Sequence, residues 1–321
     1  MAHLIEEIDG IAQMAYAGEV PWHGLGKQVP PDLSPDQMLE AAGLNWTVRK
    51  VPAFANIDAT QVAVGYSALV RSVDSKILDV VSNDWNPVQN QEAFAFFDTF
   101  VKAGDMEMHT AGSLKEGQIV WGLAKIKESF DLFKGDQIDS YLLFTNFHKY
   151  GFSTDIRFTP IRVVCNNTLT LSLNQKVERM VKISHRNEFK PDFAKEMLGI
   201  ATDKLQKYKE MAAFLGSKPA KGEDIVEYFK RIYPLTTTKE DKPNEATVSR
   251  NAKLALDILD TQPGADYAKG TWWQPYNAVT YMVDHLNGRS TDTRLSSAWY
   301  GQGKNIKTRA LDLALDMANA A

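Results

Sequence analysis

The chain has 321 residues, of which 44% are hydrophobic and 24% are charged, a globular composition long enough for two cores. Its formal charge of -4 argues against a protein that covers nucleic acid with its whole surface, so any such contact must be local. The one cysteine excludes an intramolecular disulfide and a cysteine-cluster zinc site. Because no signal-peptide pattern or long apolar run is present, we expect a soluble cytoplasmic protein without membrane contact.

The first part of the chain is predicted to contain an arm, a short helix and a hairpin. Frequent Gly and Pro residues predict an extended arm over residues 1–35. Ser34 is a typical helix N-cap and Gly43 a typical C-cap, so a short helix is expected between them. Between residues 45 and 81 the apolar residues follow a strand pattern with a turn at 73–76, which predicts a β-meander or hairpin.

A second helix and four further strands are expected before residue 170. Asn90 is expected to cap the helix, and one face of it carries apolar side chains at the spacing of a buried stripe, namely Phe94, Phe97, Phe100 and Val101. The strands are expected at residues 106–114, 118–124, 140–145 and 152–164. These elements indicate an α+β domain over residues 36–170.

The rest of the chain, residues 171–321, is predicted to be mostly helical. A helical pattern extends from Thr168 to about Leu215, and others lie near 247–260, 273–287 and 304–320. A stretch rich in Pro, Lys and Thr predicts a linker or mobile loop near 234–243. The expected fold class is therefore α+β: an antiparallel β-meander or hairpin sheet packed with helices, followed by a mostly helical C-terminal half.

Few residues suggest catalysis. The two Gly-X-Gly-Lys stretches, at 24–27 and 301–304, lack the full phosphate-loop motif, and the six histidines lack metal-ligand spacing, so we expect no cofactor and no metal site. Cys165 could act as a nucleophile if His148 or His185 were within reach as its base. A cysteine that ends an apolar strand is more often a small buried hydrophobe. The sequence leaves the question of an enzyme open and favours a protein that is not one.

Two basic segments stand out on this acidic chain. Residues 157–190 contain seven lysines and arginines against two glutamates, and residues 286–310 contain five against one aspartate. A basic segment with nearby aromatic residues suits a single-stranded polynucleotide, although a solvated helix face gives the same pattern. The candidate nucleic-acid-binding residues are Arg157, Arg162, Asn166, Asn167, Thr168, Lys176, Arg179, Lys182, Arg186, Lys304, Lys307 and Arg309.

The stretch from Phe158 to Leu169 joins an apolar strand to a polar Asn-Asn-Thr turn. Its arginine could meet phosphates, and the turn could add hydrogen bonds or, at a helix start, backbone amides. An ordinary helix N-cap is an equally good interpretation of Asn166, Asn167 and Thr168. Lys176, Arg179 and Lys182 would then share one face of the following helix.

Ordered blocks along the chain resemble a phage/plasmid-like family labelled domain of unknown function 932. They are Trp22-His23-Gly24-Leu25-Gly26, Asp84-Trp85-Asn86-Pro87-Val88-Gln89, Ala111-Gly112-Ser113-Leu114 with Val120-Trp121-Gly122-Leu123-Ala124, Thr159 to Leu169, and Asn277-Ala278-Val279-Thr280 with Asp284-His285. The resemblance implies a protein of phages, prophages or large plasmids. At the level of fold, the pattern is also similar to the ring-forming single-strand annealing recombinases, which implies an oligomer that pairs strands without ATP.

We therefore expect a single-stranded DNA-binding protein, active in annealing, recombination or replication and assembled as a homo-oligomer. One alternative is a thiol-dependent phage enzyme that uses Cys165. A second alternative is a non-enzymatic protein that acts on a host or phage partner. Exposed aromatic residues would anchor that partner, namely Trp272, Trp273, Trp299 and Tyr300.

Overall fold

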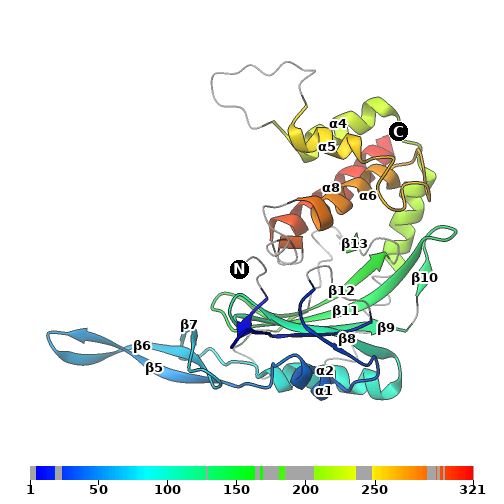
Figure 1. Ribbon diagram of the computed structural model, residues 1–321. Helices are drawn as coiled ribbons and strands as arrows, with labels where there is room; N and C mark the ends of the chain where they lie inside the picture. Colours follow the sequence, from blue (N-terminus) through cyan, green and yellow to red (C-terminus); the bar gives the residue numbers. More distant parts are fainter. Residues whose placement is uncertain are drawn as a thin grey trace. The chain divides into compact units, whose positions relative to one another are not determined.

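The computed structural model divides the chain into two compact units (Figure 1), and each is described by itself. Unit 1 comprises residues 1–127, 140–158 and 179–201, and unit 2 comprises residues 128–139, 159–178 and 202–321. The structure describes residues 5–18, 24–127, 129–162, 167–168, 181–183, 185, 206–235, 248–287, 294, 297–298 and 301–320. The boundaries differ from those expected because β11 (Gln137–Phe147) and β12 (Thr154–Arg162) each contribute residues to both units.

The largest sheet has nine strands in the order β13-β12-β11-β9-β8-β3-β4, with β10 beside β11 and β14 beside β12. The other strands of this sheet are β3 (Met14–Ala17), β4 (Lys27–Val29), β8 (Met106–Leu114), β9 (Ile119–Ile126), β10 (Phe130–Asp131), β13 (Asn167–Thr168) and β14 (Val181–Ile183). β8 pairs antiparallel with β9, and β9 pairs antiparallel with β11, so the strands expected at residues 106–114, 118–124 and 140–145 are neighbours in this sheet. The α+β class is confirmed.

Part of the expected extended arm is strand. Residues 7–8 and 11–12 form the small sheet β1–β2 (Glu7–Ile8 and Ile11–Ala12). β3 is buried along its whole length between β4, with which it pairs in parallel, and β8. Residues that looked like an irregular arm therefore extend the large sheet by two strands.

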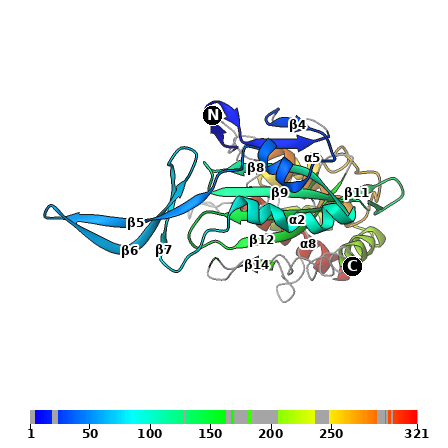
Figure 2. The same cartoon turned by 90° about the horizontal axis from the view of Figure 1, so that it is seen from below.

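Helices α1 (Pro35–Ala41) and α2 (Asn90–Ala103) pack on strands of unit 1. Ser34 caps α1 as expected, whereas Gln89 rather than Asn90 is the N-cap of α2. The predicted aromatic stripe is confirmed, because the phenylalanines of α2 are buried, and the helix itself packs on the large sheet at β8 and β9 (Figure 2). A Cβ atom on Gly122 would lie 3.1–3.2 Å from two of these rings, so glycine is needed for this close packing.

A three-stranded antiparallel sheet forms the predicted meander. It contains β5 (Val48–Ile57), β6 (Thr60–Arg71) and β7 (Ile77–Ser82), in that order. Two residues with positive φ, Asp58 and Ala59, connect β5 to β6 in a tight turn.

Unit 2 is largely helical, as expected. Residues 206–217 are helical, and α4 (Gly222–Ile232), α5 (Arg250–Asp257), α6 (Trp273–Tyr281), the π-helical turn η1 (Met282–Leu286) and α8 (Gln302–Ala320) follow. α4 was not predicted. The expected linker or loop near 234–243 lies mostly outside the described residues. Among the described helices, none combines the length and the apolarity that crossing a membrane requires.

Two details of the sequence prediction are wrong. Val181–Ile183 is not helical, because it pairs as strand β14 with Thr154–Ile156 of β12. Asn167–Thr168 is not the expected polar turn, because it pairs as strand β13 with Ile161–Arg162, and the residues that would follow a cap lie outside the described residues.

The expected aromatic anchors also need correction. Trp272 and Trp273 are each 1% exposed and belong to the core of unit 2, where Trp272 packs edge-on against Tyr228 and Trp273 packs against Tyr276. Trp299 and Tyr300 lie outside the described residues. The two described tryptophans therefore stabilise unit 2 and cannot anchor a partner at its surface.

Candidate functional site

The first basic segment is described only in part. Asn166, Lys176, Arg179 and Arg186 lie outside the described residues, as does Cys165. Arg162, Asn167, Thr168 and Lys182 lie on strands, with Arg162 opposite Asn167 in the pairing of β12 and β13. Lys182 on a strand cannot share a helical face with Lys176 and Arg179, so that part of the expected track is wrong.

Arg157 has a carboxylate partner on its own strand. Side chains two residues apart in a strand point to the same face, and Arg157 accordingly forms two bonds to Asp155, of 2.9 Å (Nε to Oδ1) and 2.6 Å (Nη2 to Oδ2). The Asp155 side chain is 5% exposed, and that of Arg157 is 18% exposed. Much of the positive charge of Arg157 is therefore neutralised within unit 1.

The two candidate bases of the thiol hypothesis are core residues. His148 is fully buried, with Nε2 2.9 Å from Asn90 Oδ1, and burial lowers its pKa to about 3. His185 is 2% exposed and stacks on Trp85 at 4.1 Å between ring centroids, and burial lowers its pKa to about 4. Both imidazoles are therefore neutral at pH 7. Each also contacts a buried neighbour, Asn90 for His148 and Trp85 for His185.

The second basic segment divides between the interior and the surface. Lys307 is completely buried, and its Nζ lies 2.8 Å from Asp284 Oδ1, whose side chain is 6% exposed. This ion pair joins α8 to η1, so Lys307 is not available to a ligand at the surface. Lys304 is partly exposed on the first turn of α8, and Arg309 is exposed two residues beyond Lys307.

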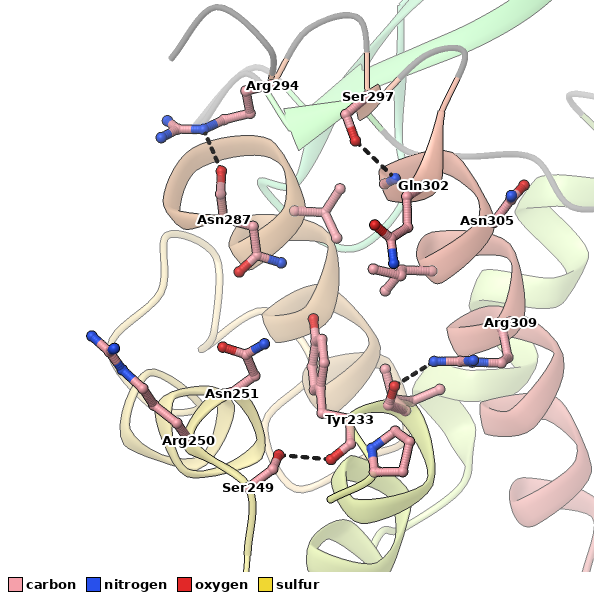
Figure 3. Close-up of a pocket in the computed structure, with 15 residues that line it drawn as sticks. Tyr233, Ser249, Arg250, Asn251, Asn287, Arg294, Ser297, Gln302, Asn305 and Arg309 are labelled. Atoms are coloured by element: carbon pink, nitrogen blue, oxygen red, sulfur yellow. Dashed lines mark hydrogen bonds between the residues drawn. The ribbon is translucent and has the colours of Figure 1, made fainter. Parts of the chain in front are cut away.

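Arg309 lines a cavity of about 830 Å³ in unit 2 (Figure 3). We call this cavity the arginine pocket. It is formed by the end of α4, the start of α5, η1 and the start of α8. Its described lining residues are Ile232, Tyr233, Pro234, Ser249, Arg250, Asn251, Val283, Asn287, Arg294, Ser297, Gln302, Gly303, Asn305, Ile306 and Arg309.

All the charged residues described in the lining of the arginine pocket are positive. It contains Arg250, Arg294 and Arg309, and no aspartate or glutamate is present among its described lining residues. Arg294 donates from Nε to the Asn287 carbonyl at 2.9 Å, and Arg309 donates to the Ile232 carbonyl. These carbonyl partners are neutral, so they orient the two guanidinium groups without cancelling their charge.

Two helix starts meet at the same place. The first turn of α5 contributes Ser249, Arg250 and Asn251, and the first turn of α8 contributes Gln302 and Gly303. Neither helix has an acidic residue in its first turn, where carboxylates are usually stabilising. The partial positive charges of both helix starts therefore add to those of the arginines, an arrangement that suits an anion.

The middle of the pocket offers neutral hydrogen-bonding groups. Figure 3 shows the ring of Tyr233 with the amide groups of Asn251, Asn287 and Gln302 around it. Burial raises the pKa of Tyr233 to about 12, so its phenol stays protonated and adds no negative charge. Each amide can both donate and accept, so the pocket can bond a neutral polar group as well as an anion.

Sequence reasoning found part of this site. Arg294 and Arg309 belong to the second basic segment, whereas Ser249, Arg250 and Asn251 were not predicted. Ser249 caps α5 by accepting a bond from Ala252 N at 3.1 Å, so an N-cap serine before a helical pattern was the available signal. That signal marks a helix start and says nothing about which other helix start lies beside it.

Comparison with known proteins identifies the family. Residues 77–299 match the family described as Domain of unknown function (DUF932). No curated protein and no solved structure matches the chain. Because the family match covers more than half of the chain, the chain belongs to this family of unknown function.

Proposed function

We propose that the protein binds single-stranded DNA and that the arginine pocket holds part of the strand. The observation that carries this proposal is that three arginines and two helix starts line one pocket whose described lining residues include no carboxylate. On a chain with a formal charge of -4, such a concentration of positive charge favours a local anionic ligand. Phosphate matches it well, because the planar guanidinium group can donate two parallel hydrogen bonds to it.

A single strand fits the pocket better than a duplex. A cavity of about 830 Å³ is in the range of small-ligand sites, so it can take about one or two nucleotides. The amides of Asn251, Asn287 and Gln302 match the mixed donor and acceptor edges of unpaired bases. In a duplex these edges are paired, and the phosphates lie on a convex surface that a pocket of this size cannot enclose.

We further propose that bound strands are annealed without ATP, in phage- or plasmid-type recombination or replication. The sequence has no complete phosphate-loop motif, and its family resemblance to mobile-element proteins motivates this biological setting. Mixing two complementary labelled oligonucleotides with the protein tests annealing. If the protein does not change the rate of duplex formation, the annealing proposal is rejected, whereas the proposal of strand binding is unaffected.

The binding proposal is tested by fluorescence anisotropy with a labelled oligonucleotide of about twenty nucleotides at several salt concentrations. The test variant combines Arg250→Gln with Arg294→Gln, which removes two positive charges and keeps polar side chains at both positions. Arg309 is left in place because its bond to the Ile232 carbonyl connects α8 with α4. The control variant combines Lys207→Gln with Lys253→Gln, two exposed lysines of unit 2 that do not line the pocket.

Each phosphate contact contributes roughly 0.7 to the slope of log affinity against log salt for a single strand. The arginine variant should therefore reduce the slope by roughly 1.4 and weaken binding at least tenfold at low salt. The lysine variant should bind almost as the unchanged protein does. Equal weakening in both variants would show a diffuse charge effect and contradict binding in the pocket, and no salt-dependent binding by the unchanged protein would reject the proposal altogether.

A further inference from the structure

The tip of the β5–β6 hairpin is not covered by any of the described residues. From here on, the arm means residues 51–66 and not the N-terminal segment 1–35. It extends away from the rest of unit 1 in both views (Figures 1 and 2). No residue of the arm is buried. Its large apolar side chains are 37–56% exposed, and they are Val51, Phe54, Ile57, Val62, Val64 and Tyr66. Its single charged residue, Asp58, lies in the turn.

The edges of the arm are also open. β7 pairs with β6 only between Tyr66 and Val70, so residues 60–65 have no partner on that side among the described strands. β5 is the outer strand of its sheet, and its other edge has no described partner either. An exposed two-stranded hairpin is marginally stable in water, and an unpaired apolar edge readily pairs with another strand.

One face of the arm is apolar and uncharged. In the register of β5 with β6, Ala55 lies opposite Val62 and Ile57 lies opposite Thr60, so these four side chains share a face. The register of β5 with β6 shifts between Pro52 and Phe54, and Gly65 lies beside this irregularity with a φ of +75°, so pairing in the outer part of the arm is uninterrupted only from Phe54 to Ile57. The open edge available to a partner is therefore short and lies near the tip.

We propose that the arm is covered by the same arm of a second copy of this chain. A two-fold contact uses the same patch on both subunits, and that patch must be complementary to itself. An uncharged apolar surface meets this condition without repulsion between like charges. A nucleic acid or an anionic membrane would instead call for Lys or Arg, and residues 51–66 contain neither.

Pairing of the β5 edges gives the contact a definite register. Two antiparallel β5 strands centred on Asn56 place Ala55 of one copy opposite Ile57 of the second copy, on the same face of the joined sheet. The apolar faces of the two hairpins then continue into one another. The contact depends only on the arm and is independent of the arginine pocket.

Sedimentation velocity between about 1 and 50 μM tests the proposal. The unchanged protein should form dimers or larger assemblies, and the variant Ile57→Lys with Val62→Lys should have a dissociation constant at least tenfold higher. The control is Val73→Lys with Ile77→Lys, at two residues outside the arm that are 58% and 62% exposed, the first in the turn between β6 and β7 and the second at the start of β7. The control should assemble like the unchanged protein, and circular dichroism should show both variants folded.

A second measurement examines the register directly. Asn56→Cys should make the assembled protein susceptible to crosslinking by a short bismaleimide, whereas the unchanged chain, which retains Cys165, provides the background. A monomeric unchanged protein over the whole concentration range would overturn the proposal, as would assembly that survives the arm substitutions or crosslinking no higher than background. Binding of a monomer to neutral phosphatidylcholine vesicles through the arm would also overturn it, in favour of a membrane.

Discussion

Acidification should destabilise unit 1 through a buried histidine. His148 Nε2 lies 2.9 Å from Asn90 Oδ1. The Asn90 amide nitrogen donates to the Leu44 carbonyl, so its oxygen is the acceptor and the imidazole proton is on Nε2. Nδ1 of His148 is buried and has no hydrogen-bond partner among the described residues. A second proton would therefore have to be placed on a buried nitrogen that has no acceptor among the described residues.

The size of the effect follows from the difference between the folded and unfolded pKa. Burial lowers the pKa of His148 to about 3, against about 6.5 in an unfolded chain. Because the folded state binds the proton more weakly, the full stability is present above pH 6.5 and is lost as the pH falls towards the folded value. The free energy of unfolding decreases by about 1.4 kcal/mol per pH unit in that range, or about 2 kcal/mol at pH 5.

Urea denaturation at pH 7.5 and pH 5.0 measures this difference. In His148→Gln the amide can still donate to Asn90 but does not titrate, so the loss of stability between the two pH values should be about 2 kcal/mol smaller than in the unchanged protein. His109→Gln removes a half-buried imidazole of the same unit, outside this cluster, and serves as the control: a change of the same size there would show that the effect is not specific to His148. If His148→Gln lost as much stability as the unchanged protein, the buried imidazole would not be the cause.

Two further substitutions test unit 1. Arg71 is 1% exposed and forms ion pairs with Glu6 at 2.5 Å and with Asp74 at 2.6 Å. Arg71→Met leaves these carboxylates without their partner and should lower the free energy of unfolding by about 3–5 kcal/mol. A loss below about 1 kcal/mol in chemical denaturation would contradict this expectation. Ala59 has a φ of +64° in the arm turn, so Ala59→Gly should stabilise the turn by up to about 1 kcal/mol and raise the melting temperature slightly, whereas a lower melting temperature would argue against strain there.

The regular parts of the fold could be predicted because their signals are local. β8 and β9 are two largely apolar runs joined by a short turn, and α2 repeats its phenylalanines at helical spacing. β14 could not be found this way, because three residues, Val181–Ile183, become a strand only by pairing with Thr154–Ile156, a segment far away in the sequence. The arginine pocket could not be predicted for the same reason, because the two helix starts that line it, at Arg250 and Gln302, are about fifty residues apart in the sequence.

Counting charges along the sequence overestimates how many cations of the second basic segment are available to a ligand. Lys307 and Arg309 are two residues apart, yet one is buried against Asp284 and the other lines the pocket. The buried face of α8 explains the difference, since Lys307 lies on it with Gly303, Ala310, Leu311, Ala314 and Ala318. Helical periodicity predicts this face, so the sequence already contained the reason to exclude Lys307.

The two proposals therefore depend on different residues and can fail separately. Arg250 and Arg294 lie in unit 2, and their replacement should weaken DNA binding without changing the assembly state. Ile57 and Val62 lie in the arm of unit 1, and their replacement should dissociate the copies. If the dissociated variant still binds a strand but no longer anneals two, annealing requires strands held by neighbouring copies. If it anneals normally, one copy brings both strands together and the arm has another role.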